Sequence, residues 1–387
     1  MVKKLQIARL LFTLIIFALL STGFGSITAQ DDGGCSDDDE DDRIDAFEQR
    51  HPDDGSYIGA FANVENSDLN SLILPLYSPQ SPLNQPIPAD AAIDPDSDAR
   101  IELLAEQAED GILLSFRAWT MSAYVTDANT PRHDVELTAC WSPFGVMLNV
   151  PIPDGALPDP VGDGGMAILA LDEGYEYDFW QIEQLEDGRW QAAWGNRTPL
   201  DGDGNFVHGF SARGSGFTAL AGLIWPAELD AGRIEHALIA SIPEPAAGGP
   251  IYPATESDGF SSNPLALPEG ARLQLNPDLD LDSLDLTPWQ RTIAETLQTY
   301  GVFIADIGGT DFEIEAVNAI SWSSWPFGQH FDDLTQADYE DTETGGLSLD
   351  MFSIEDFRVL VLGNQNAYSD EESSLDETLY AEPRYDD

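Results

Sequence analysis

The sequence has very few basic residues, and lysine is almost absent from it. Lysine and arginine together number 16 against 70 acidic residues, which gives a formal net charge of −54 over 387 residues. Both lysines, Lys3 and Lys4, lie at the extreme N-terminus. The remaining chain therefore has no lysine for a Schiff base, for a phosphate-binding P-loop or for a basic surface track. Because the negative field repels nucleic acid and anionic membranes, we expect no nucleic-acid partner.

Cysteine is equally scarce. The two cysteines, Cys35 and Cys140, are too few for a disulfide framework, and we expect Cys140 to be a small buried residue. The sequence has no Cys-x-x-Cys pair or cysteine–histidine cluster of the kind that binds zinc. It also lacks the strand–GxGxxG–helix pattern of dinucleotide-binding domains.

The abundance of acid has two explanations. It can keep the protein soluble in salt or at low water activity. It can instead load divalent cations or attract a cationic partner. Composition alone leaves both open.

The N-terminus has the pattern of a secretory signal peptide over residues 1–29. Lys3, Lys4 and Arg9 precede an apolar run at 10–20, and small residues follow at 26–29. The apolar run is too short for a membrane span, so we expect a secreted protein with no stable span after cleavage. Residues 30–56 are dominated by like charge and predict a disordered acidic tail, as do residues 366–387.

Residues 57–365 predict a mainly β fold, an antiparallel β-sandwich or jelly-roll-like single domain with two or three small helices. Short apolar runs alternate with Gly and Pro turns, and Gly and Pro together number 58 (33 and 25). Met166–Leu171, Tyr175–Ile182 and Arg189–Trp194, joined by tight turns, indicate an antiparallel meander. Two further strands, 302–306 and 312–317, look like a hairpin.

Helix signals are fewer but sharper. Thr287 as N-cap, Pro288 at the first helical position and Gln290 three residues after the cap predict a helix ending near Gly301. Shorter helices are predicted after Asp98 and over 225–229.

A series of motifs resembles an uncharacterised family of secreted bacterial proteins. The motifs include SPLNQPIPAD, YEYDFWQ, ARGSGFTALAGLIWPAEL, AGRIEHAL, PATESDG and PEGARLQL, and the resemblance covers roughly residues 78–363. It implies one continuous domain and no particular activity. It also implies that Asp163, in a DGGM motif, stands where the family has DGHM, so a histidine is missing beside it.

Glu176 and Asp178 are the first candidates for catalysis. They lie two apart on a predicted strand, so both carboxylates share one face about 7 Å apart, near the spacing of glycosidases that activate a water. Alternatively, both point to solvent beside a hairpin. Tyr177, Trp180 and Trp194 are candidates for binding substrate, because sugar rings stack on aromatic faces.

Three further side chains are candidates for the same site. His236 alternates with Ile234 and Leu238 in a predicted strand over 233–242, as a core histidine or as a general acid–base. Asp163 is an acid–base or orienting candidate. Arg213 could neutralise a substrate carboxylate, or pair with one of the many acids.

Asp201, Asp203 and Asn205 have the D-x-D-x-N spacing that begins many calcium loops. The twelfth position is Ala212, where an EF-hand has a bidentate glutamate, so a flexible turn is the alternative. Calcium is the one cofactor that the sequence suggests.

Together these residues favour a secreted protein that binds or cleaves a polysaccharide or cell-envelope glycan, as a hydrolase or a lyase. The alternative is a non-catalytic surface or adhesion protein, with or without stabilising calcium, in which the same residues are core and hairpin groups.

Overall fold

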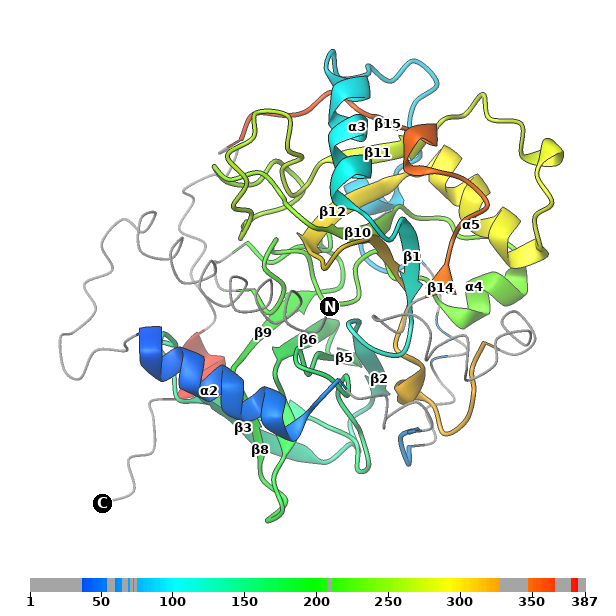
Figure 1. The fold of residues 1–387 in the computed structure, drawn as a ribbon. Coiled ribbons are helices and arrows are strands. Elements are labelled where there is room, and N and C mark those ends of the chain that lie inside the picture. Colours follow the sequence, from blue (N-terminus) through cyan, green and yellow to red (C-terminus); the bar gives the residue numbers. More distant parts are fainter. Residues whose placement is uncertain are drawn as a thin grey trace.

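The computed structural model describes residues 37–53, 60–64, 69, 72, 75–207, 211–327, 347–365 and 377–381. The predicted signal peptide and most of the predicted C-terminal tail lie outside these residues. In the described part, 16 strands form three sheets and four α-helices lie around them (Figure 1). The prediction of a mainly β fold with small helices is confirmed.

The largest sheet has seven strands in the order β14–β1–β13–β10–β12–β11–β15. Its pairs β1–β13 and β10–β12 are parallel, and its other pairs are antiparallel. The predicted hairpin over 302–317 is wrong, because β10 lies between β12 and β13 and pairs with both. The strands are β1 (Ile112–Ser115), β10 (Leu238–Ile242), β11 (Arg272–Leu275), β12 (Val302–Ile307), β13 (Phe312–Glu315), β14 (Leu347–Ser348) and β15 (Phe357–Val359).

The second sheet contains the first two strands of the predicted meander. Its order is β2–β5–β6–β9, with β2 (Ser122–Thr126), β5 (Met166–Ala170), β6 (Tyr175–Trp180) and β9 (Trp194–Pro199). β5 and β6 are antiparallel, as predicted, but the antiparallel partner on the other side of β6 is β9 rather than residues 189–194, and β2 joins β5 in parallel.

The third sheet has five strands in the order β16–β4–β3–β8–β7. Its parallel pair β3–β8 means that each sheet is mixed, although antiparallel pairs predominate. The predicted strand over 189–194 is split, because the chain passes from this sheet to the second one at Ala193. The strands are β3 (Arg132–Leu137), β4 (Val146–Pro151), β7 (Glu183–Gln184), β8 (Trp190–Ala192) and β16 (Tyr380–Ala381).

Capping residues in the sequence mark the ends of two of the helices. α5 (Pro288–Thr299) begins at the predicted cap, where Thr287 and Gln290 form a capping box. α4 (Pro226–Ala231) ends at Gly232 in the left-handed conformation. α3 is Ser97–Gln107, and short 3₁₀ turns occupy Pro82–Asn84, Leu281–Ser283, Ala319–Ser321, Ile354–Asp356 and Glu377–Leu379.

Residues 37–50 form a helix, α2 (Asp37–Arg50), where we predicted a disordered tail. The helix is held by contacts with other segments, which the acidic composition of residues 30–56 does not indicate. Phe47 is buried, Arg43 donates to the Gln181 amide oxygen at 2.7 Å, and the buried Glu40 carboxylate accepts from the Cys140 N–H at 3.0 Å. Figure 1 shows α2 beside β3 and β8.

Cys140 differs from the expectation of a small buried residue, because it is exposed and disulfide-bonded. The sequence has one other cysteine, Cys35, which lies outside the described residues.

Three apolar cores lie between successive layers, which are the helices, the seven-stranded sheet, the four-stranded sheet and the five-stranded sheet. The first lies between the helices and the seven-stranded sheet and includes Ile101, Leu229, Ile293, Leu114 and Leu238. The second lies between the seven- and four-stranded sheets and includes Ile239, Phe303, Ala123, Ala167 and Leu169. The third lies between the four- and five-stranded sheets and includes Ile168, Phe179, Val135, Met147 and Trp190.

In the described part of the chain, the helices are all too short or too polar to cross a membrane.

Candidate functional site

Polar groups, rather than apolar ones, face each other at one end of the space between the seven- and four-stranded sheets. Alternation along β6 sends Tyr177 and Phe179 into the third core, so Glu176 and Asp178 point to the opposite side. Both carboxylates are fully buried, which excludes the alternative that they point to solvent.

Glu176 and Asp178 are held by hydrogen bonds from their surroundings. Glu176 accepts from the Tyr77 hydroxyl at 2.7 Å and from the Leu220 N–H at 2.9 Å. Asp178 accepts from the Asn196 amide at 3.2 Å, across the β6–β9 pair.

Burial raises the pKa of both carboxyls, and for Asp178 the Glu176 carboxylate raises the pKa further, well above its usual range. Like charges this close favour a shared proton, so we describe Glu176 and Asp178 as a proton-sharing pair.

Arg213 lies between the two sheets and is almost fully buried. Its two terminal nitrogens donate to both oxygens of Glu315 on β13, at 2.8 and 2.9 Å, and one reaches Asp306 at 3.4 Å. Burial lowers the pKa of Arg213, but the carboxylates of Glu315, Asp306 and Asp178 together outweigh burial and the pKa is raised. Arg213 is thus paired with acids of the protein, the second of its two expected roles.

Asp163 lies just before β5 and is partly exposed. Burial raises the pKa of its carboxyl, opposed by a hydrogen bond from Trp180 and by the charge of Arg213. Glu315 and Asp258 raise this pKa further, so Asp163 belongs to the same electrostatic neighbourhood as Arg213.

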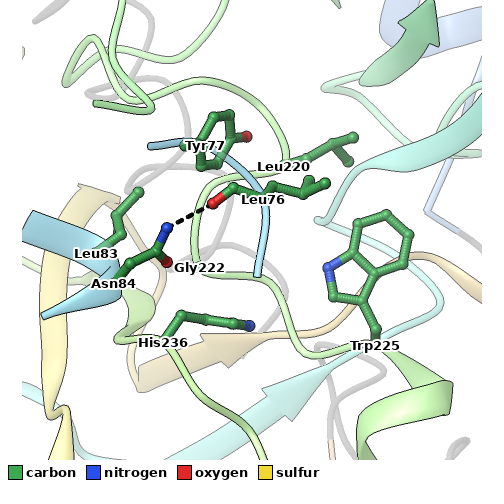
Figure 2. A pocket seen from close by; sticks show the side chains of 8 residues that line it. All are labelled: Leu76, Tyr77, Leu83, Asn84, Leu220, Gly222, Trp225 and His236. Atoms are coloured by element: carbon green, nitrogen blue, oxygen red, sulfur yellow. Dashed lines mark hydrogen bonds between the residues drawn. The ribbon is translucent and has the colours of Figure 1, made fainter. Parts of the chain in front are cut away.

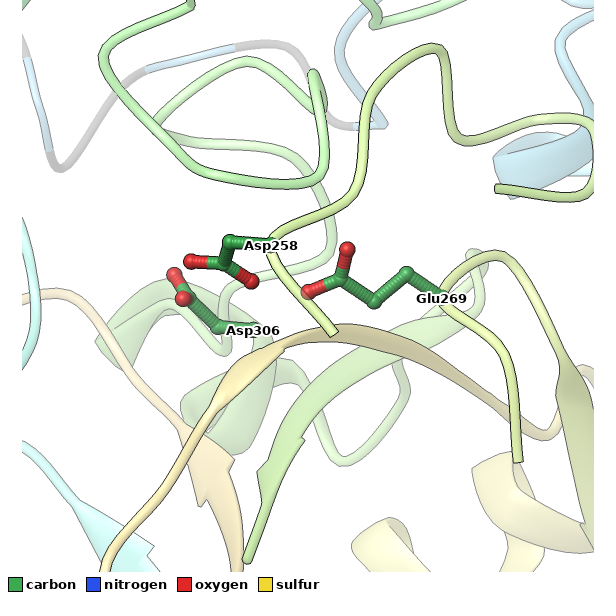
Figure 3. A group of neighbouring side chains, drawn as sticks. All are labelled: Asp258, Glu269 and Asp306. Carbon is green, nitrogen blue, oxygen red and sulfur yellow. The ribbon is translucent and has the colours of Figure 1, made fainter. Parts of the chain in front are cut away.

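Three acids that the sequence analysis did not single out complete this neighbourhood. One oxygen each from Asp258, Glu269 and Asp306 lies within 4.8 Å of the others, so the group could hold a metal ion. Figure 3 shows the Asp258 carboxylate between those of Glu269 and Asp306. We call these three residues the acidic triad.

The acidic triad, the proton-sharing pair, Asp163, Arg213 and Glu315 together form what we call the acidic chamber. In sequence the triad is inconspicuous, because its members stand beside turn glycines in SDG, PEG and ADIGG. One signal was present: Glu313 and Glu315 alternate with apolar residues on β13, which places two acids on one face of a fully buried strand.

His236 lies outside the acidic chamber. It precedes β10 rather than forming part of a strand, so the predicted strand over 233–242 begins only at Leu238. Its ring is buried, with Nε2 3.1 Å from Glu228 on α4 and Nδ1 2.9 Å from the Ala237 carbonyl. Burial lowers the pKa of His236, but the Glu228 carboxylate and the Ala237 carbonyl together outweigh burial and the pKa is raised.

Beside His236 is a small, partly open space of about 10 Å³, roughly the room of one water molecule. In Figure 2 the His236 ring lies below it and Trp225 to one side. The lining also includes Leu76, Tyr77, Leu83, Asn84, Leu220 and Gly222. This space is too small for a sugar ring.

The predicted calcium loop has its polar groups committed to other segments. Asp203 accepts from the Tyr252 hydroxyl at 2.7 Å, and the Asn205 amide donates to the Pro253 carbonyl at 2.9 Å. Asp201 is exposed. Among the described residues, the acids that gather closely enough for a metal are those of the acidic triad.

Of the three aromatic candidates, Trp180 alone keeps part of its surface exposed, with the Arg43 guanidinium 5.3 Å from its ring centre. Tyr177 is buried and donates to Glu173 at 2.7 Å. Trp194 is buried against Trp141 and Tyr380.

The chain matches no known protein family, no curated protein and no solved structure. The resemblance to secreted bacterial proteins therefore stays a prediction from the motifs.

Proposed function

We propose that the protein binds or cleaves a polysaccharide outside the cell, and that it does so at the acidic chamber. One observation carries this proposal: Asp163 and Asp306 come from separate segments to Arg213, Asp258 lies in the field of both, and each of the three acids keeps part of its surface exposed. Clustered carboxylates with perturbed pKa values are typical of catalytic sites, and carboxylates also accept hydrogen bonds from sugar hydroxyls.

Asp163 is the residue that we assign to acid–base chemistry. Because burial raises its pKa, its carboxyl can hold a proton at higher pH than an exposed aspartate and donate it to a leaving oxygen. Trp180, which bonds Asp163 and is partly exposed, offers the stacking surface.

The other residues that the sequence suggested for the site are buried and do not line the exposed part of the acidic chamber. The proton-sharing pair and the Arg213–Glu315 ion pair are buried, so they hold the chamber in shape rather than touch a glycan. His236 is paired with Glu228 outside the chamber, and we give it no part in the reaction.

The test is a screen of the purified protein on a polysaccharide panel, following reducing ends for hydrolysis and ultraviolet absorbance of unsaturated products for elimination. Asp163→Asn should lose at least about 100-fold of any activity found, the usual contribution of a general acid or base. Asp172→Asn, at an exposed turn, is the matched control. Equal activity in the two variants would exclude Asp163 from the chemistry.

A non-catalytic surface or adhesion protein stabilised by calcium is our second proposal. It is favoured by the complete burial of Glu176 and Asp178, which can only be structural in this conformation. Glycan binding without product formation would support it, and so would a lower melting temperature in EDTA. The net charge of −54 weighs against a nucleic-acid partner under either proposal.

A further inference from the structure

Glu269 is the starting point, because no basic side chain in the described part of the chain forms an ion pair with its buried carboxylate. It lies between Ala266 and β11, and its side chain is fully buried. Neither carboxylate oxygen has a hydrogen-bond partner of normal geometry. A buried ionised carboxylate without donors is costly, so Glu269 is expected either to hold a proton or to meet a cation.

The neighbours of Glu269 increase this cost. Figure 3 shows the Glu269 carboxylate directed at Asp258, with Asp306 on the other side of Asp258. Asp258 also has a buried oxygen without a partner. The Asp258 carboxylate lies directly against the backbone of Gly214, where a Cβ would be 2.4 Å from one of its oxygens.

The nearest cation does not neutralise the acidic triad. Arg213 donates its two short hydrogen bonds to Glu315, and its nearest nitrogen is 3.4 Å from an oxygen of Asp306. Three carboxylates therefore share one long contact to a guanidinium. Such a group becomes neutral in one of two ways, by taking up protons or by binding a cation.

We propose that Asp258, Glu269 and Asp306 bind one divalent cation, and that the cation is calcium. Carboxylate oxygens are hard ligands, which calcium, magnesium and manganese prefer over nitrogen or sulfur. Calcium–oxygen bonds of 2.3–2.6 Å allow two ligands on one ion to stand up to about 5 Å apart, which the oxygens within 4.8 Å satisfy without rearrangement. Magnesium is usually held by one or two carboxylates in a near-ideal octahedron, so a group of three carboxylates favours calcium.

A calcium ion can reach the acidic triad from solvent, and water can complete its coordination. The Asp306 side chain keeps 28% of its surface exposed, and Asp258 is also partly exposed, so the triad opens to solvent on the side away from Glu269. Calcium takes six to eight oxygens, and water can supply those that the three carboxylates do not. This inference does not depend on the glycan proposal.

The experiment measures calcium uptake and stability of the full-length protein after treatment with EDTA. Equilibrium dialysis at about 0.15 M salt, where loosely held surface counter-ions are screened, compares the wild type with Glu269→Gln and Asp258→Asn. The wild type should bind one calcium more than either variant. Asp201→Asn is the matched control, because it removes a carboxylate from the loop that the sequence predicted, and it should retain that calcium.

Melting temperatures give an independent readout. Calcium at about 100 times its Kd should raise the wild-type melting temperature by on the order of 5 °C, and should leave Glu269→Gln unchanged. Without calcium, Glu269→Gln should melt higher than the wild type, because the amide removes a buried like charge. Equal uptake by wild type and Glu269→Gln, or loss of the ion in Asp201→Asn, would overturn the assignment. Calcium binding without activity on any glycan would instead refute only the proposed function.

Discussion

Removing the charge of Arg213 should be among the most damaging single changes in this protein. Arg213→Met keeps most of the length of the side chain but leaves Glu315, whose side chain is 5% exposed, without its donor. Breaking a buried ion pair from one side costs about 3–5 kcal/mol, because the remaining charge is uncompensated. Here we expect the upper end of that range, because Asp306 and Asp163 add like charge beside Glu315.

Urea unfolding at pH 7.5 in EDTA measures this loss, with the m-value as a check that the unfolded state is unchanged. Arg189→Met is the control, because Arg189 pairs with Glu136 and Asp187 but is 63% exposed, and its loss should stay under about 1 kcal/mol. In the double variant Arg213→Met, Glu315→Gln, both charges are gone, so at least half of the loss should return.

The reasoning is refuted if Arg213→Met costs less than about 1 kcal/mol, or if the double variant is as unstable as the single one. Either result would mean that Glu315 is protonated or solvated in the wild type. The acidic chamber would then not depend on Arg213.

Three further outcomes are expected. First, stability in EDTA should fall as pH rises from about 4 to about 8. The pKa values of Glu256 and Asp311 are about 8 and about 6 in the folded state, above the usual value near 4, so their contribution is fully present below pH 4 and lost on the way to pH 8. A urea midpoint that rises over this range would contradict it. Second, Asp178→Asn should equal or exceed the wild type in stability at pH 8, because the amide replaces the protonated carboxyl of the pair and needs no proton from solution, whereas Asp178→Ala should lose about 1–3 kcal/mol by leaving Asn196 unpaired; similar losses in the two variants would count against the proton-sharing pair. Third, Thr287→Ala should cost about 1 kcal/mol by removing the cap of α5, and no change in the unfolding midpoint would show that the cap contributes nothing.

Elements with a local signal could be predicted from the sequence. The capping box at Thr287 and Gln290 defines the start of α5 within a few residues, and the turn through Gly174 joins two strands whose partners are adjacent in the chain. In both cases the interactions that decide the structure lie within one short window. This is why the β5–β6 hairpin and the helices α3, α4 and α5 were predicted close to their observed positions.

Pairing between distant segments could not be predicted in the same way. β10 is buried on both faces, so its sequence has no alternation to indicate which strands flank it. The hairpin predicted between β12 and β13 failed for this reason, since nothing near residues 307–310 reports that an earlier strand is inserted there. α2 was missed because Phe47 and Arg43 find their partners only in the folded structure.

The candidate site was predicted in part. Glu176, Asp178, Asp163 and Arg213 do share one neighbourhood, but the sequence did not reveal that Glu176 and Asp178 face another sheet rather than solvent. The acidic triad was missed because its members come from a loop, the residue before a turn and the end of a strand. Only the stacking of two sheets brings them together.

The crossing at Ala193 has a consequence for how the molecule assembles. One residue separates β8 from β9, so the five- and four-stranded sheets share a backbone and cannot come apart one at a time. The seven- and five-stranded sheets both close late in synthesis, because Ile112 of β1 pairs with Phe312 of β13 and Met147 of β4 pairs with Tyr380 of β16, about 200 and about 230 positions further along. Contacts of such long range are entropically slow to form, so we expect folding to be slow and to require most of the chain. We expect the two smaller sheets to unfold together in a single cooperative step.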